Sequence, residues 1–262
     1  MCGRYTQTKA ESLLRKRFRF QGTELEMPPR YNLAPGQEAR VVLTSESGRR
    51  LVPMRWGLVP SWAEDESIGN RLINARAETL LQKPSFRTAF QQRRCLVPAD
   101  SFFEWKKEPG SKRKVPIRFV LKGEDPFAFA GLWEAWRAPD GHELRTFTVI
   151  TSLPNRLVAE VHDRMPAILK EEDEEAWLDP TLTDPARLAP LLAPFPAERM
   201  EAYAVSSRVN SGQIDEPALI ERVALDESGM PVEPAAEREK SRKKKGKAPD
   251  PAQRSLFDVS GE

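Results

Sequence analysis

The residue best placed for chemistry is Cys2, which directly follows the initiator methionine. A methionine before so small a side chain is usually removed, so we expect the mature chain to begin with a cysteine. Such a residue carries an amine that titrates near neutral pH and a thiol whose ordinary pKa is about one unit higher. Together they can trap an aldehyde, because the amine forms an imine and the thiolate then closes a thiazolidine ring. The alternative is that Cys2 is incidental to the start codon.

Two further residues could move the protons that imine formation requires. Glu104 stands between Phe103 and Trp105, and apolar surroundings raise the pKa of a carboxyl group towards values useful in acid–base catalysis. His162 lies where a predicted helix ends, shortly before Pro166. Each also has a plain structural interpretation, as an outward-facing strand glutamate and as a structural histidine.

Asn74 is the candidate for orienting an amine or a sugar hydroxyl, because a buried asparagine both donates and accepts hydrogen bonds. Taken alone, the residue type favours an asparagine that caps a turn or a helix.

Arginine and tryptophan side chains recur through the same segments. Arginine binds phosphates and aromatic rings stack on unpaired bases, so this pattern favours single-stranded DNA over recognition in the major groove. The alternative is that the tryptophans form the core and the arginines cover them. The side chains concerned are Arg4, Trp56, Trp62, Arg76, Trp105 and Arg164.

Composition limits the possible classes. The chain has 262 residues and a formal net charge of only +2, so global charge does not identify a nucleic-acid binder. Two cysteines and two histidines in unrelated contexts match neither a disulfide scaffold nor a zinc site, and we expect no metal and no cofactor. No signal peptide and no membrane-spanning run is recognisable, which predicts a cytoplasmic protein.

The elements that must position these side chains are mostly strands. Because no regular βαβ alternation occurs, we expect an α+β fold with mainly antiparallel sheets in a barrel-like core, flanked by short helices. The expected helices span residues 8–18, 85–93, 155–161 and 171–178. The expected strands span residues 41–44, 52–56, 95–97, 117–121, 127–136, 146–151 and 202–206.

Composition changes near Leu225, which divides the chain into a domain over residues 1–225 and a tail over residues 226–262. The tail is rich in Pro, Ala, Lys and Glu, and such a segment cannot bury enough apolar surface to fold, so we expect it to be disordered. Its basic run, residues 242–247, is either a solvated spacer or a nonspecific contact to the DNA backbone.

The end of the tail departs from that composition. Gln253, Leu256 and Phe257 resemble the short peptide that bacterial replication proteins insert into a sliding-clamp pocket. The sequence therefore predicts a docking peptide for the replication clamp over residues 253–257.

Several short runs, in order along the chain, together resemble the SOS response-associated peptidase (SRAP) family, the abasic-site processing proteins. Two small departures exist: Ser101-Phe102-Phe103 stands where a glycine and often a tyrosine are expected, and Pro154 replaces a usual alanine. The matching runs are Cys2-Gly3-Arg4-Tyr5, Arg55-Trp56-Gly57-Leu58-Val59-Pro60, Asn74-Ala75-Arg76-Ala77-Glu78-Thr79, Arg94-Cys95-Leu96-Val97-Pro98-Ala99-Asp100, Phe103-Glu104-Trp105, Gly131-Leu132-Trp133-Glu134, His162-Asp163-Arg164-Met165-Pro166 and Val205-Ser206-Ser207-Arg208-Val209-Asn210.

The resemblance implies a barrel-like core with a basic groove for single-stranded DNA. It implies that Cys2 removes Met1 and then crosslinks the ring-opened aldehyde of an abasic site, with Glu104 as the acid–base residue. Asn74 would position the Cys2 amine and His162 would assist ring opening. The expected phosphate contacts are Arg4, Arg76 and Arg164, with Trp105 beside the lesion. We expect a nucleoid-associated monomer that acts in the DNA damage response.

Two other functions remain as alternatives. One is a cysteine or N-terminal-nucleophile peptidase that acts on peptides or amides through the same Cys2. The other is a non-catalytic module that binds single-stranded DNA, in which replacing Cys2 changes nothing.

Overall fold

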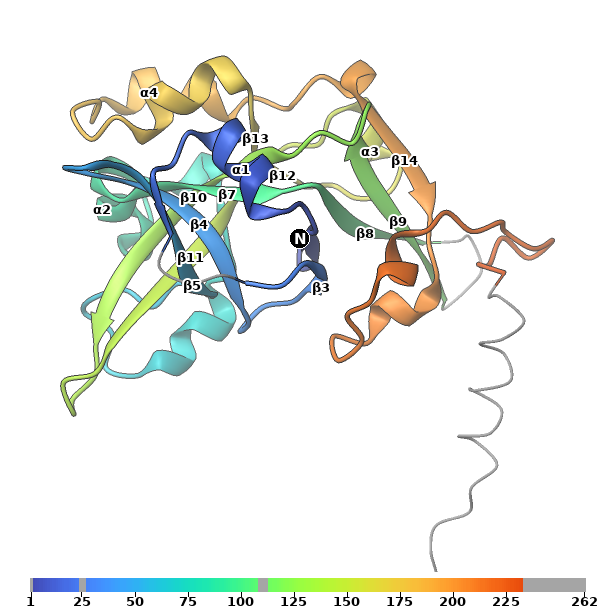
Figure 1. Cartoon of the computed structure of the whole chain (residues 1–262), viewed down its shortest axis with the longest axis horizontal. Helices are drawn as coiled ribbons and strands as arrows, with labels where there is room; N and C mark the ends of the chain where they lie inside the picture. Colours follow the sequence, from blue (N-terminus) through green and yellow to red (C-terminus); the bar gives the residue numbers. More distant parts are fainter. Residues whose placement is uncertain (1, 24–26, 108–112, 233–262) are drawn as a thin grey trace, which may run out of the picture.

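The computed structural model of the chain describes residues 2–23, 27–107 and 113–232. Two sheets carry the fold, and the N-terminal segment lies between them (Figure 1). The predicted clamp-binding residues Gln253, Leu256 and Phe257 lie outside the described residues.

The larger sheet closes on itself. Its strands follow the order β12–β11–β10–β7–β4–β5–β2, and β11 also pairs in parallel with β5, which completes a five-stranded barrel. The prediction of a barrel-like, mainly antiparallel α+β fold is confirmed. The strands are β2 (Gly22–Thr23), β4 (Glu38–Ser45), β5 (Gly48–Trp56), β7 (Arg94–Ala99), β10 (Phe127–Arg137), β11 (Glu143–Ser152) and β12 (Met165–Pro166), joined by β6 (Asn74–Arg76) on β11 and β13 (Ile168–Leu169) on β10.

The smaller sheet is antiparallel and runs in the order β14–β9–β8–β1–β3. Only a bend at Asp100 separates the barrel strand β7 from β8, so one continuous segment supplies both sheets. The N-terminal strand lies inside this sheet, since β1 pairs with β8 on one side and with β3 on the other. The strands are β1 (Tyr5–Gln7), β3 (Arg30–Leu33), β8 (Ser101–Lys107), β9 (Lys114–Leu121) and β14 (Met200–Ala204).

The helices are short and cover the barrel. Each predicted helix exists, but most are shorter than the periodicity indicates. They are α1 (Glu11–Phe18), α2 (Pro84–Gln92), α3 (Arg156–Ala159), α4 (Glu174–Leu178) and α5 (Pro185–Leu188), with single 3-10 turns at η1 (Glu66–Arg71), η2 (Ala77–Thr79), η3 (Glu171–Asp173), η4 (Ala189–Leu192), η5 (Ala197–Arg199), η6 (Ser207–Asn210) and η7 (Pro217–Ile220).

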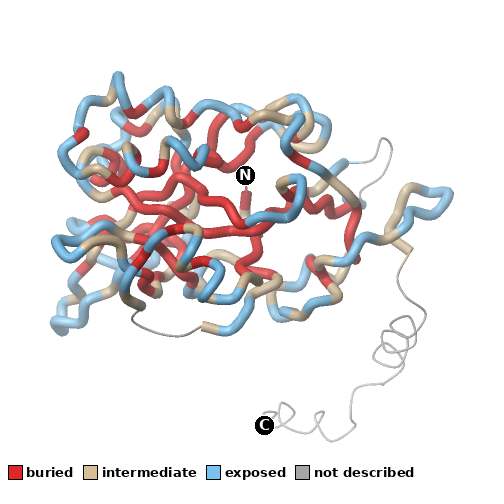
Figure 2. Tube along the Cα trace, turned by 45° about the horizontal axis from the view of Figure 1, so that its top comes forward, coloured by how far each residue is buried: buried red, intermediate tan, exposed pale blue. Residues whose placement is uncertain are grey.

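The core fills the barrel and continues under the N-terminal strand. Tyr5 packs edge-on against Trp56 with their ring centroids 5.0 Å apart, and Trp56 stacks on Phe147 at 6.3 Å. Figure 2 shows the buried residues concentrated on the central strands of both sheets. Burial therefore reaches the very start of the described chain, where Cys2 has no exposed surface.

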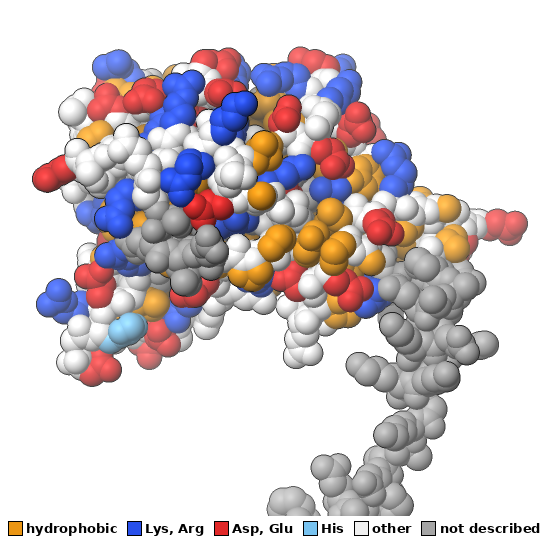
Figure 3. Space-filling view, viewed as in Figure 1, with side chains coloured by type: hydrophobic (Ala, Val, Ile, Leu, Met, Phe, Trp, Pro, Cys, Tyr) orange, Lys and Arg blue, Asp and Glu red, His pale blue; other side chains and the backbone are white. Residues whose placement is uncertain are grey.

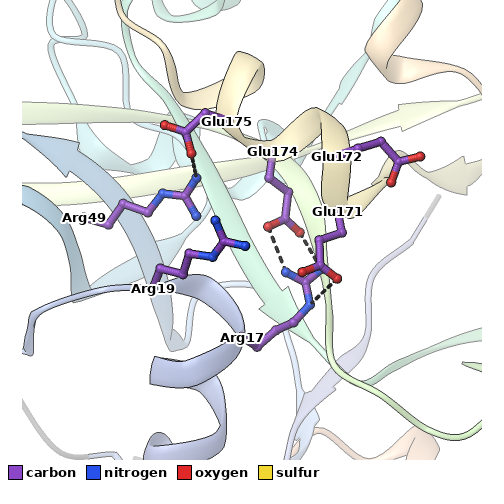
Figure 4. Close-up of a pocket in the computed structure, with 7 residues that line it drawn as sticks. All are labelled: Arg17, Arg19, Arg49, Glu171, Glu172, Glu174 and Glu175. Atoms are coloured by element: carbon purple, nitrogen blue, oxygen red, sulfur yellow. Dashed lines mark hydrogen bonds and ion pairs between the residues drawn. The ribbon is translucent and has the colours of Figure 1, made fainter.

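An ion-pair cluster joins α1 to the segment around α4 (Figure 4). Both terminal nitrogens of Arg17 donate to Glu174, at 2.7 and 2.9 Å, and Arg49 donates to Glu175 at 2.7 Å. These side chains line a cavity of about 480 Å³ that contains none of the predicted site residues. On the face seen in Figure 3, basic and acidic side chains are interspersed rather than gathered into a patch of one sign.

The described fold continues past the predicted boundary at residue 225. The Asp226 amide donates to the Met230 carbonyl and the Val232 amide to the Ala224 carbonyl, each at 2.8 Å. Met230 also packs against the main core cluster, so the turn over residues 224–232 belongs with the domain. In the described part of the chain, no helix is both long and apolar enough to cross a membrane.

Candidate active site

Cys2 is buried at the start of the chain and is held by a residue distant in the sequence. The Nδ2 of Asn74 donates to the Cys2 carbonyl at 2.8 Å. Asn74 lies on β6, which pairs in parallel with the barrel strand β11, and this pairing places the Asn74 amide beside Cys2. The Cys2 thiol lies 3.8 Å from the Arg4 carbonyl. Burial, reinforced by the nearby Glu104 carboxylate, raises the pKa of the Cys2 thiol far above its ordinary value, so the resting thiol is protonated.

Glu104 lies on β8 and is 2% exposed. Its pKa is raised to about 7, chiefly by burial and also by Asp163, while the N-terminal amine and Lys114 oppose the shift. A carboxyl group with this pKa is present in both protonation states at neutral pH, which suits a residue that must both give and take a proton. Glu104 therefore has the environment that the neighbouring aromatics predict.

His162 follows α3 and faces Glu104, with its Nε2 3.9 Å from the Glu104 carboxylate. Its Nδ1 accepts a hydrogen bond from the Arg164 amide at 3.0 Å, which assigns the proton of the neutral ring to Nε2. Burial lowers the pKa of His162 below its ordinary value, so the ring is neutral at neutral pH. The Asp163 carboxylate lies 2.9 Å from the same Nδ1 and would form an ion pair with the ring when it is protonated.

Arg4 and Trp105 form one wall next to this centre. The Arg4 guanidinium donates to the Asn32 side chain at 2.7 Å and to the Val209 carbonyl at 2.6 Å. It also lies 5.9 Å from the centroid of the Trp105 ring. The Trp105 indole nitrogen donates to the Asn210 side chain at 2.6 Å, so the ring plane is fixed.

The two remaining arginines differ in their surroundings. Arg76 ends β6 and is exposed, as a phosphate contact requires. Arg164 is mostly buried; it donates to both Glu78 carboxylate oxygens, at 2.8 and 2.9 Å, and to the Thr151 carbonyl at 2.6 Å. A phosphate could reach the Arg164 guanidinium only by displacing Glu78.

The two tryptophans predicted from the same segment also differ. Trp56 is 1% exposed, stacks on Phe147 and donates its indole proton to the Ile73 carbonyl at 2.8 Å. The prediction that Trp56 stacks on a DNA base is therefore wrong, because no face of its ring can be reached. Trp62 is 59% exposed on a loop that Trp136 holds by a 2.7 Å hydrogen bond to the Ala63 carbonyl, so base stacking by Trp62 stays a prediction.

A close glycine contact helps to hold the Trp62 loop. Gly57 adopts φ +129°, and a Cβ built on Gly69 would lie 2.7 Å from the Gly57 carbonyl oxygen. Only glycine at both positions lets the two backbone segments approach in this way.

Sequence reasoning missed Asn32, although it organises the wall beside the site. Its Nδ2 donates to the carbonyls of Ser211 and Ile214 at 2.9 and 2.7 Å, and its side-chain oxygen accepts from Arg4. It is fully buried in β3, and a polar residue between Tyr31 and Leu33 is the only sequence signal. Among the described residues there is no group of three or more His, Cys, Asp or Glu side chains that could hold a metal ion.

Known proteins resemble this chain over most of its length. The family model described as SOS response associated peptidase (SRAP) matches residues 1–212. The abasic site processing protein YoqW of Bacillus subtilis is 49% identical over 224 residues, covering 84% of this chain and 99% of that protein. The abasic site processing protein HMCES of Gallus gallus is 34% identical over 235 residues, covering 78% of this chain and 68% of that protein.

A solved structure agrees with the sequence relatives. The crystal structure of a protein from Bacteroides thetaiotaomicron superposes with a TM-score of 0.77 at 30% sequence identity, covering 85% of this chain and all of that one. The fold, the family model and the relatives agree, and the chain belongs to the SOS response associated peptidase (SRAP) family.

Proposed function

We propose that this protein processes abasic sites in DNA by trapping their ring-opened aldehyde on the mature Cys2. The observation that carries the proposal is the meeting of the buried Cys2 and Glu104 with the partly exposed His162 in one centre. The names of the relatives support the substrate, since the similar proteins in Bacillus subtilis and Gallus gallus are abasic site processing proteins.

The reaction consists of two additions to one carbon and one loss of water, and the proposal assists these steps by proton transfer, without an oxidant or a metal. The Cys2 amine adds to the aldehyde carbon, and the resulting carbinolamine loses water when protonated Glu104 donates to its hydroxyl. The Cys2 thiol then adds to the imine carbon, its proton passes to the Glu104 carboxylate and the imine nitrogen becomes an amine. One aldehyde and one cysteine thus give one thiazolidine and one water.

The second bond explains the value of a thiol beside the amine. An imine at the abasic sugar withdraws electrons and promotes β-elimination, which breaks the strand. Ring closure removes the C=N bond, so the thiazolidine protects the strand that a simple imine would cleave. This is the chemical reason for a cysteine, rather than any other residue with a free amine, at the N-terminus.

Asn74 is positioned to serve the mature amine. Its Nδ2 holds the Cys2 carbonyl, while its Oδ1 is buried and has no hydrogen-bond donor among the described residues. A buried acceptor without a donor is costly, and the Cys2 amine released by loss of Met1 is a donor of the right kind. Removal of Met1 by the protein itself, with Glu104 as the acid–base group, belongs to the same proposal.

The proposed DNA surface surrounds this centre. Single-stranded DNA would place its phosphates near Arg4 and Arg76 and stack unpaired bases on Trp62 and Trp105. A phosphate at Arg164 would take the place of the Glu78 carboxylate, which binds in the same bidentate manner. We place the protein in the DNA damage response, at the nucleoid.

Intact mass and denaturing electrophoresis test the proposal together. The purified protein should lack Met1 and form a heat-resistant adduct, without reductant, only with single-stranded DNA that carries an abasic site. Undamaged DNA of the same sequence is the control. Loss of Met1 without any adduct would contradict aldehyde trapping and favour a peptidase that acts on peptides or amides.

The tail carries a separate proposal, that residues 253–257 dock on the replication sliding clamp. A synthetic tail peptide should bind the purified clamp, because the apolar side chains of Leu256 and Phe257 would gain burial in the clamp pocket. A peptide with both residues replaced by alanine is the matched control. Absence of binding at high micromolar peptide would contradict this partner without affecting the aldehyde chemistry.

A further inference from the structure

Two oppositely charged buried side chains hold the backbone segment that follows Cys2. Asp100 and Arg40 are 2% and 3% exposed, and both contact residues 6–9, at the end of β1 and just beyond it. We call these two side chains, with Thr6, the N-terminal clasp. None of them belongs to the proposed chemistry or to the proposed DNA surface.

The Asp100 carboxylate accepts hydrogen bonds from the amide and hydroxyl donors of this segment. Its two carboxylate oxygens accept from the Thr6 hydroxyl, from the Thr8 amide at 2.6 Å, from the Thr8 hydroxyl at 3.0 Å and from the Lys9 amide at 3.3 Å. Its own amide donates to the Thr6 carbonyl at 3.1 Å. The Thr6 hydroxyl also lies 2.7 Å from the Ser101 hydroxyl, so the same residue is tied to the first position of β8.

The Arg40 guanidinium donates hydrogen bonds to the carbonyl acceptors of the same segment. Its Nη2 donates to the carbonyls of Gln7 and Lys9, at 2.7 and 3.4 Å. The Gln7 side chain returns two bonds to Arg40, accepting from its amide at 3.0 Å and donating to its carbonyl at 2.8 Å. The segment is therefore held from both sides by charge-assisted hydrogen bonds, which are stronger than neutral ones.

Strand pairing alone fixes the position of this segment only weakly. With β8, β1 forms the pairs Tyr5–Phe102 and Thr6–Ser101, followed by one backbone bond from the Phe103 amide to the Arg4 carbonyl at 3.0 Å, and its pairing with β3 is irregular between Tyr5 and Gln7. A slip of one residue would move Cys2 by about 3.3 Å and turn its side chain to the other face. Reacting atoms must approach to about 3–3.5 Å, and a displacement of about 1 Å can slow a reaction on the order of a hundredfold.

We infer that Asp100 is a positioning residue for the reaction of Cys2, acting with Thr6 and Arg40. By fixing the register of β1 against β8, it sets the Cys2 amine and thiol opposite Glu104. Asp100 lies four residues before Glu104, on the segment that continues into β8, and Thr6 lies four residues after Cys2, on β1, so the clasp joins the two segments that carry the reacting groups. The inference rests on the proposed function for its catalytic readout only.

Asp100→Asn and Thr6→Val test the clasp in the full-length mature protein. Both should slow adduct formation at saturating abasic DNA by about tenfold or more, while the half-saturating DNA concentration changes by less than about twofold. Thr6→Ser keeps the hydroxyl and should restore the wild-type rate. Thr148→Val is the matched control, because the buried Thr148 hydroxyl has no hydrogen-bond partner in the described part of the chain.

A second readout does not depend on abasic DNA. In the folded protein, iodoacetamide should alkylate Cys2 on the order of tenfold faster in Asp100→Asn and Thr6→Val than in the wild type, with Cys95 unchanged as the internal reference. Both cysteines are fully buried, so a parallel rise at Cys95 would indicate general loosening and overturn the inference. Wild-type alkylation and wild-type rates in Thr6→Val would also overturn it.

The two readouts separate the inference from the proposed function. If the wild-type protein forms no adduct, the proposed function fails, and the Cys2-to-Cys95 alkylation ratio still decides whether the clasp holds the N-terminus. If the wild-type protein forms the adduct and the clasp variants match it in both readouts, only the positioning role of Asp100 fails.

Discussion

Replacing the thiol should abolish the stable adduct with abasic DNA and leave only a reversible imine. Cys2→Ala still offers a terminal amine once Met1 is removed, which intact mass verifies before the assay, so the first bond to the aldehyde can still form. The thiazolidine cannot close without sulfur. We therefore expect a loss of the heat-resistant, unreduced adduct by at least about a hundredfold, as for other lost nucleophiles.

The same variant should also damage the strand that the wild type protects. Its imine is trapped by borohydride, so reduction should recover a protein–DNA band, and without borohydride the DNA should show more nicking than with the wild type. Both products are measured on one denaturing gel with end-labelled single-stranded DNA. A heat-resistant adduct of wild-type yield without reductant would contradict the role of the thiol.

Cys95→Ala is the control for loss of a cysteine as such. Cys95 is fully buried on β7, and its sulfur occupies space that Gly131 leaves open, so its loss should affect packing rather than chemistry. The adduct yield of this variant should equal that of the wild type at a temperature where both are folded.

The fold class could be predicted because its local signals agree with its long-range structure. The predominance of strand-forming segments and the absence of regular βαβ units predicted the mainly antiparallel, barrel-like core. The first helix shows where such reasoning stops. Periodicity begins the helix at Thr8, but the Thr8 amide donates to Asp100, and α1 begins only at Glu11. The Asp100 carboxylate, 92 residues beyond Thr8 along the chain, binds the amides of Thr8 and Lys9, and local sequence does not record that contact.

The site could be predicted as a set of residues but not as an arrangement. Cys2, Glu104 and His162 each sit in a short run with recognisable chemistry, whereas their meeting depends on closure of the barrel and pairing of β1 with β8. Trp56 and Trp62 lie only six positions apart, yet barrel closure buries one and leaves the other exposed. Burial of this kind depends on distant partners, which no local pattern records.

The second large effect concerns Glu104. Glu104→Gln keeps the size of the side chain and removes its ability to exchange protons. We expect adduct formation and Met1 removal to slow by at least about tenfold, the usual loss for an acid–base group. The rate of the wild type should change with pH around the Glu104 pKa of about 7, and this inflection should be absent from the variant.

Stability provides a signature that a misfolded variant would not share. Burial raises the Glu104 pKa from 4.5 to about 7 in the folded protein, so the folded state holds its proton after the unfolded chain has lost it. The wild type therefore loses stability as pH rises from about 4.5 to about 7, by at most about 3 kcal/mol. A glutamine has no such penalty, so the variant should gain stability relative to the wild type between pH 5 and pH 8.

Urea unfolding of both proteins at pH 5 and pH 8 measures this difference directly. A variant that is slower in chemistry yet relatively more stable at pH 8 would show that Glu104 is held in an unfavourable, buried environment for the sake of proton transfer. A stability difference that stays constant with pH would contradict the raised pKa, and an unchanged rate would return Glu104 to the status of a structural strand residue. The two measurements are independent, because urea unfolding reports the free energy of ionising the buried carboxyl group and the reaction rate reports its role in proton transfer.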